Sequence, residues 1–160
     1  MTWLSRQRTA DPAGLLRAGI LALAGVAAVG TAIELASDRH WHGTLQLVPW
    51  AALLVLTIAL LLLTIRPGQQ AVKLARVLAG LVVLASIFGV VKHVQANLDA
   101  GVLDVAYETR WTSLSFPVQL WYAMTKTVGP TPPLAAGVLA QAAFLTLLAS
   151  WRHPATTRAR

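Results

Sequence analysis

Four long apolar runs occupy nearly half of this 160-residue chain. At about 1.5 Å per residue, roughly 20 residues cross the ~30 Å hydrocarbon core of a bilayer, so runs of this length are typical of membrane-spanning helices. Only 12% of the residues are charged, about half the proportion in soluble proteins. The runs are 18–36, 45–65, 77–91 and 134–151. They predict an all-α, multi-pass integral membrane protein.

Capping and turn-forming residues place the ends of the predicted helices. Asp11 followed by Pro12 is typical of a helix N-cap and first helical position. The sequence Arg66-Pro67-Gly68 ends the second helix in a tight turn, while Gly101 closes the third and Thr131-Pro132-Pro133 opens the fourth. We predict a single membrane domain, residues 1–160, that forms an up-down bundle of four spanning helices at about 14–36, 46–66, 71–96 and 132–151.

The third apolar run is short for a membrane span. Its fifteen uncharged residues, 77–91, extend only about 22 Å. We therefore expect polar residues flanking this run to be drawn toward the membrane. The short imidazole of His93 cannot reach far toward the headgroups, so His93 is a candidate for a functional role.

The charges predict which way the chain is oriented. Nine of the thirteen Lys and Arg residues fall on the side of the two termini, and five of the six acids fall on the other side. Because Lys and Arg concentrate in cytoplasmic segments, both termini are predicted to be cytoplasmic. The nine basic residues are Arg6, Arg8, Arg17, Arg66, Lys73, Arg76, Arg152, Arg158 and Arg160.

The connection between the third and fourth helices, residues 99–130, is long for a compact bundle. It carries Phe116, Leu120, Trp121, Tyr122 and Met124 at helical spacing. This amphipathic pattern predicts an interfacial helix lying over the outer mouth of the bundle, where it could act as a lid.

Glu34 is the only acidic residue inside an apolar run, about one turn from the outer end of the first predicted helix. Thr31 and Gly30 precede it by three and four residues and so share its helix face. Small residues allow close packing of helices in membranes. We therefore expect Glu34 to face the interior of the bundle.

The third predicted helix presents a similar face. Ser86, Gly89, His93 and Asn97 are spaced by three, four and four residues. We expect His93 and Asn97 to face inward at the depth of Glu34. The connection between the first two helices adds further polar groups there, namely Asp38, Arg39, His40, His42 and Gln46.

These residues predict a polar pocket at the outer face. The expected ligand-binding residues are Glu34, His93 and Asn97, with Glu108 contributed by the outer loop. Carboxylates and imidazoles also bind divalent metals, and Glu34, His40 and His93 would form the best trio. Specificity is low, because no helix carries His-x-x-x-His or Glu-x-x-His spacing.

A purely structural role for the same residues is the alternative. Glu34 would then pair with Arg39 or accept a hydrogen bond from His93, and so lock the first helix to the third. Buried paired charges of this kind often serve only structure.

Several classes of function are disfavoured by the sequence. The absence of cysteine excludes disulfides, thiolate metal sites and cysteine nucleophiles. The sequence disfavours a haem held by two histidines, since only His93 is clearly helical. The net charge of +7 resides in short segments flanking apolar runs, which argues against nucleic-acid binding. No signature of a hydrolytic triad is present, so we favour a non-enzymatic protein.

Two segments resemble small bacterial four-helix membrane proteins to which no activity is attached. They are His93-x-x-x-Asn97 followed by Tyr107-Glu108, and Pro132-Pro133 leading through Ala135-Ala136-Gly137 to Arg152-His153-Pro154. The resemblance covers the second half of the chain best. It implies a location in the bacterial cytoplasmic membrane.

The leading hypothesis is a membrane component that binds a small ligand or metal at its outer face. The lipid bilayer is its expected surrounding. One alternative is a structural or accessory subunit, as a homo-oligomer or with a partner membrane subunit, since helix one (Gly19, Gly25, Gly30) and helix four (Gly137) carry small residues. Another is passage of protons or small solutes through an oligomer.

Overall fold

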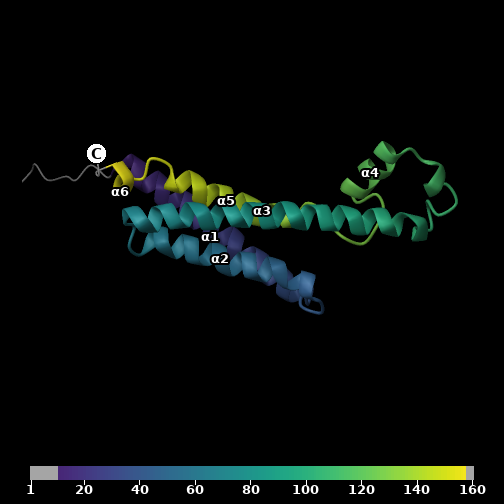
Figure 1. The fold of residues 1–160 in the computed structure, drawn as a ribbon, viewed down its shortest axis with the longest axis horizontal. Coiled ribbons are helices and arrows are strands. Elements are labelled where there is room, and N and C mark those ends of the chain that lie inside the picture. The colour runs from purple at the N-terminus through teal and green to yellow at the C-terminus, as the bar shows by residue number, and fades with distance from the viewer. Residues whose placement is uncertain (1–10, 158–160) are drawn as a thin grey trace, which may run out of the picture.

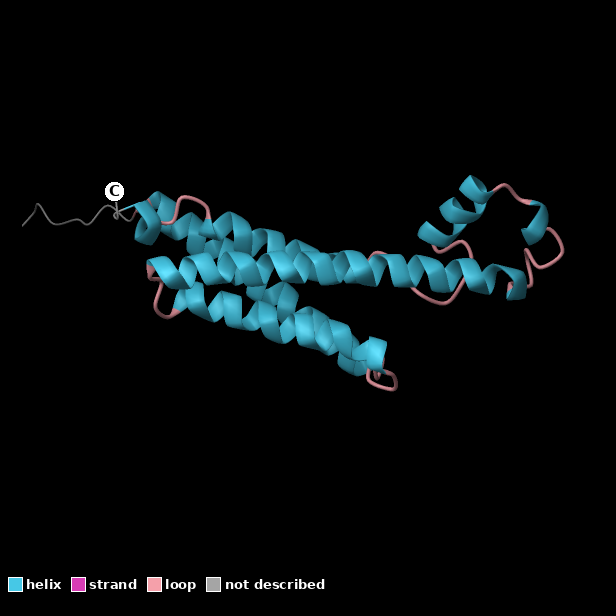
Figure 2. Ribbon diagram, in the orientation of Figure 1, coloured by secondary structure: helices cyan, strands magenta, loops and turns pink. Residues whose placement is uncertain are grey.

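The computed structural model describes residues 11–157, and all the regular structure in this part of the chain is helical, with no β-strand (Figures 1 and 2). The all-α prediction is confirmed. Arg6, Arg8, Arg158 and Arg160, which contribute to the predicted orientation, lie outside the described residues. The elements are α1 (Pro12–Ser37), α2 (Val48–Thr64), α3 (Gln69–Ala100), α4 (Phe116–Met124), α5 (Ala135–Ser150) and α6 (Pro154–Thr157), with 3₁₀ turns at Thr44–Leu47, Gly101–Leu103 and Trp111–Ser113.

Three of these helices are long and apolar enough to span a membrane. They are α1, α2 together with the turn that precedes it (Thr44–Thr64), and α3. The helix α5 is apolar but has only 16 residues, about 24 Å. The predicted fourth helix, 132–151, is therefore too long at its start. Pro132 and Pro133 lie in the turn before α5 rather than in its first turn.

Helices α1, α2, α3 and α5 pack together around small and aliphatic side chains. The helix α5 contacts α1 and α3, while α2 contacts mainly α3. Ala79, Val82 and Leu139 belong to the central core. A Cβ added at Gly89 would lie 3.0 Å from the Cβ of Ala136, so this glycine allows α3 and α5 to approach closely, as its place on the small-residue face predicts. Many leucines and valines on the outer faces remain exposed, as lipid contact requires.

The helix α3 is much longer than the third apolar run. Its 32 residues extend about 48 Å, and Figure 1 shows it continuing past the ends of α1 and α2. The predicted third helix, 71–96, is therefore too short at both ends, because the polar residues after Val91 continue the helix as far as Ala100. Gly101 follows its last residue, and the ring of Trp111 lies where a Cβ of Gly101 would be.

The long connection after α3 folds back on the projecting part of that helix. In Figure 1, α4 lies beside the far end of α3, away from α1 and α2. Trp111, Ala123 and Val128 are buried there, and the rings of Tyr107 and Tyr122 pack edge to face at 5.1 Å. The predicted helix exists, but its placement over the mouth of the bundle is wrong, because α3 carries it beyond that mouth.

A buried amide fixes this fold-back. Asn97 is fully buried, and its Nδ2 donates to the carbonyl oxygens of Ala123 (2.9 Å) and Thr131 (2.8 Å). Its Oδ1 accepts from the backbone N–H (3.0 Å) and the hydroxyl (2.8 Å) of Thr131. Gly129, at φ +83°, passes so close to Asn97 that a Cβ would overlap it. All four hydrogen-bonding positions of the amide are used, and we name this contact the Asn97 clamp.

Two arginines hold the opposite end of the bundle, where α1 begins and α5 ends; we name it the terminal end. Arg17 Nε donates to the carbonyl oxygen of Ala149 (2.9 Å). Arg76 donates through Nε to Ser150 Oγ (3.1 Å) and through Nη2 to the Ser150 carbonyl oxygen. The last carbonyls of a helix lack intrahelical partners and carry partial negative charge, so these two cations stabilise the end of α5.

His153 follows α5 at the same end and is only 7% exposed. Burial, and then the positive charges of Arg17 and Arg76, hold the pKa of this imidazole below its ordinary value of 6.5. Its Nδ1 accepts the N–H of Ala155 (3.2 Å). The folded protein therefore favours the neutral ring, with its hydrogen on Nε2.

Replacing Asn97 by alanine should destabilise the protein by about 3 kcal/mol, because the groups that the amide satisfies would lose buried partners. Thermal unfolding in a fixed detergent, followed by circular dichroism, measures this change. The matched control is Gln95→Ala, since Gln95 is an exposed amide on the same turn of α3. Equal melting temperatures for the two variants would contradict a structural role for the clamp.

Stability should fall as the pH drops below about 6.5, because the unfolded imidazole of His153 takes up a proton before the folded one does. Above this pH both states hold the neutral ring, and the effect vanishes. The measurement is the melting temperature between pH 7.5 and 5.5. His153→Gln should flatten the curve, whereas His42→Gln, at an exposed histidine, should leave it unchanged. A slope that persists in His153→Gln would show that another group is responsible.

Candidate ligand pocket

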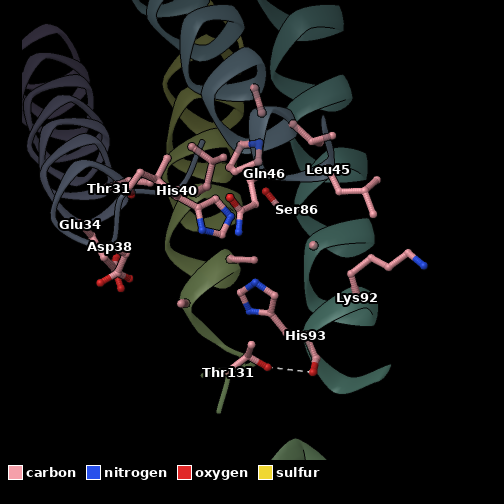
Figure 3. A pocket seen from close by; sticks show the side chains of 18 of the residues that line it. Thr31, Glu34, Asp38, His40, Leu45, Gln46, Ser86, Lys92, His93 and Thr131 are labelled. Carbon is pink, nitrogen blue, oxygen red and sulfur yellow. Dashed lines mark hydrogen bonds between the residues drawn. The ribbon is translucent and has the colours of Figure 1, made fainter. Parts of the chain in front are cut away.

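A cavity of about 520 Å³ lies where α1 ends and α2 begins, between α1, α2, α3, α5 and the segment 130–132. We name this part of the molecule the pocket end. Most of the wall is apolar, including Leu35, Ala52, Phe88 and Leu139. Its volume falls in the range of small-molecule sites, which are typically apolar with a few placed polar groups. Figure 3 shows those polar groups around the cavity.

His93 comes from α3, and its ring is oriented by the segment before α5. Its Nδ1 lies 3.0 Å from the carbonyl oxygen of Pro132. Because a carbonyl can only accept, Nδ1 carries the hydrogen, and Nε2 of the neutral ring presents a lone pair. The hydroxyl of Thr131 lies 3.0 Å from the carbonyl oxygen of His93 and 2.8 Å from Asn97 Oδ1, and its one hydrogen is shared between these two acceptors on α3. His93 thus offers a fixed hydrogen-bond acceptor.

His40 and Gln46 enter from the connection between α1 and α2. The indole Nε1 of Trp50 donates to the carbonyl oxygen of His40 (2.8 Å), and Gln46 Oε1 accepts the N–H of His42 (2.7 Å). These bonds fix the connection while the His40 ring and the Gln46 amide line the cavity. In Figure 3 they point toward the space that His93 enters from the other side.

Two carboxylates mark one edge of the cavity. Glu34 and Asp38 are one helical turn apart at the end of α1, and both line the pocket. Both are exposed, so Glu34 does not lie deep inside the bundle as expected. In the part of the chain that the structure describes, Glu34 makes neither the expected ion pair with Arg39 nor a hydrogen bond with His93. The proposed helix lock is therefore not formed.

Lys92 also borders the cavity, but it extends away from it in Figure 3. Its Nζ donates to Gln95 Oε1 (3.0 Å) on the outer surface of α3. The other charged groups that border the cavity are the exposed carboxylates of Glu34 and Asp38.

Asn97 and Glu108 were predicted to bind ligand, but neither lines the cavity. The amide of Asn97 is used entirely by the clamp. Glu108 is exposed in the turn beyond α3, where its N–H donates to the carbonyl oxygen of Asp104 (2.7 Å). None of the residues of α4 lines this cavity either, so α4 is not a lid over it.

The predicted metal trio is not assembled. Glu34, His40 and His93 border one cavity, but within residues 11–157 no three His, Cys, Asp or Glu side chains are grouped closely enough to hold a metal ion. The reason is that α1 and α3 stand on opposite sides of the cavity.

Sequence reasoning missed the segment 130–132 as part of the ligand space, whereas Asp38, which it placed in the polar cluster, does line the cavity. The spacing of His93 and Asn97 did predict a common face, but not its partner, because only the folded connection brings Thr131 and Pro132 against α3. No protein-family model, curated protein or solved structure matches this chain. Its function must therefore be inferred from the geometry of the site.

Proposed function

We propose that this protein is a non-enzymatic component of the bacterial cytoplasmic membrane that binds a small amphipathic ligand at its extracytoplasmic face. The chain would form one membrane domain in which α5 is the fourth span, with both termini in the cytoplasm. The observation that carries the proposal is the cavity at the pocket end, with its apolar wall and with the carboxylates of Glu34 and Asp38 at its edge.

The groups around the cavity select the chemistry of the ligand. Glu34 and Asp38 offer negative charge, and His93 Nε2 offers a lone pair. These groups favour a ligand that carries hydrogen-bond donors and a positive charge, such as an amine. The apolar wall favours a ligand whose remainder is hydrocarbon.

The distribution of charge supports the orientation. Arg17, Arg66 and Arg76 lie at the terminal end, whereas Glu34 and Asp38 lie at the pocket end. This is the asymmetry that the positive-inside rule describes. The pocket end would then face the outside of the cell.

A second candidate function is that of an accessory subunit or homo-oligomer. Gly19, Gly25, Gly30 and Gly137 have no neighbouring atom within 4 Å of an added Cβ. Such surfaces permit close approach of another helix. Passage of a solute through one copy is disfavoured, because the packed core around Leu56, Val72 and Ala79 fills the bundle between the pocket and the terminal end.

Hexylamine, which is a cation at neutral pH, should raise the melting temperature of the purified protein more than hexanoate does at equal concentration. The double variant Glu34→Gln, Asp38→Asn should weaken hexylamine binding about tenfold, which corresponds to about 1.4 kcal/mol. Isothermal titration calorimetry in a non-ionic detergent measures the affinity.

Glu108→Gln is the matched control, since it removes an exposed acid that does not line the cavity. Its affinity for hexylamine should equal that of the wild type. Equal losses in Glu108→Gln and in the double variant would reject the pocket as the binding site, and so would a stronger effect of hexanoate.

The orientation can be tested with reporter fusions in bacterial cells. Alkaline phosphatase inserted at Gly43, in the connection between α1 and α2, should be active because that enzyme requires export. The same reporter inserted at Pro67, in the turn between α2 and α3, should be inactive. The opposite pattern would place the pocket in the cytoplasm.

A further inference from the structure

The terminal end brings together three side chains that can donate hydrogen bonds to an anion. Arg17 comes from α1, Arg76 from α3, and His153 from the segment between α5 and α6. Arg17 and Arg76 bind successive residues at the end of α5, Ala149 and Ser150. His153 follows Ser150 by only three residues, so the contacts of the two arginines with the end of α5 bring all three groups to the same end of the bundle.

The contacts with α5 orient both guanidinium groups but use only some of their N–H donors. A guanidinium carries five N–H donors; Arg17 uses one of them on Ala149, and Arg76 uses two on Ser150. Within the described residues no buried side-chain nitrogen lacks a hydrogen bond. The remaining donors therefore lie at the surface, on groups whose direction is already fixed by α5.

No carboxylate neutralises this pair of cations among residues 11–157, since neither arginine forms an ion pair there. Asp11 caps the start of α1 and so lies at the terminal end, but its carboxylate accepts the N–H of Ala13 (3.2 Å). Segments 1–10 and 158–160 contain no acidic side chain. Two fixed positive charges without a counter-ion among residues 11–157 favour the binding of an anion.

We propose that Arg17, Arg76 and His153 form a binding site for a phosphate-bearing anion at the terminal end. Arginine suits phosphate because its planar fork donates two parallel hydrogen bonds to phosphate oxygens. The contacts with α5 hold both forks in place, which lowers the entropy cost of binding. His153 adds a third donor through Nε2, since its Nδ1 is engaged by Ala155.

The phosphate can come from an anionic lipid headgroup or from free phosphate. This site lies at the opposite end of the bundle from the ligand pocket and does not depend on it. Its occupation would also strengthen the contacts around the end of α5, because the anion reduces the repulsion between Arg17 and Arg76.

The test uses the full chain, stripped of lipid in a non-ionic detergent. Dihexanoyl phosphatidylglycerol, dihexanoyl phosphatidylcholine and inorganic phosphate are each titrated at constant ionic strength. Native mass spectrometry counts bound molecules, and the melting temperature reports stabilisation. We expect phosphatidylglycerol to bind at least tenfold more tightly than phosphatidylcholine, a difference of about 1.4 kcal/mol.

Arg17→Gln and Arg76→Gln should each reduce binding about tenfold. His153→Gln, which leaves both guanidinium contacts with α5 in place, should reduce it about threefold even if an arginine variant folds poorly. The matched controls are Arg66→Gln and Lys73→Gln, which remove exposed charges at the same end and should bind as the wild type does.

The outcomes separate the sources of phosphate. Binding of inorganic phosphate that depends on Arg17 and Arg76 supports a site for free phosphate, whereas binding of phosphatidylglycerol alone supports a lipid site. Equal binding of phosphatidylcholine and phosphatidylglycerol, together with no binding of inorganic phosphate that depends on Arg17 and Arg76, overturns the proposal. So does an equal loss in Arg66→Gln, since that result would reflect general surface charge.

Discussion

The Asn97 clamp is the interaction on which the arrangement of the second half of the chain depends. One buried amide joins α3 to the end of α4 and to the segment that leads into α5. The same segment supplies the carbonyl of Pro132 that orients His93. Because a buried amide is stable only with all its hydrogen bonds made, the clamp specifies one path for the chain. The wall of the ligand pocket follows from that path.

The two ends of the bundle carry charges of opposite sign, and the contacts that these charges make differ between the ends. At the terminal end, Arg17 and Arg76 bind the last carbonyls of α5, where the helix dipole favours cations. At the pocket end, Glu34 and Asp38 have no ion-pair partner in the described chain. The two arginines therefore stabilise the fold with some of their N–H donors and leave the others exposed. The two carboxylates make no ion pair among the described residues.

Sequence reasoning predicted the elements of the fold better than their contacts. Asp11 caps α1 through its side chain as predicted, because capping depends on residues that are close along the chain. The face shared by His93 and Asn97 was also predicted, but His93 lines the cavity whereas Asn97 holds the backbone of the segment after α3. Asn97 donates a hydrogen bond to the carbonyl oxygen of Ala123, 26 residues away, and no local sequence pattern identifies that partner. The metal trio failed for the same reason, since helical spacing does not fix the distance between helices.

The sequence by itself determined that the chain is helical, apolar and divided in charge, because hydrophobic periodicity, caps and basic clusters act over a few residues. Only the tertiary structure decided that α3 projects beyond its neighbours, that α4 packs on this projection, and which polar groups border one cavity. Those features depend on close approaches such as that of Gly89 to Ala136 and on the buried bonds of Asn97. Both join residues distant in the chain, where packing rather than local propensity sets the geometry.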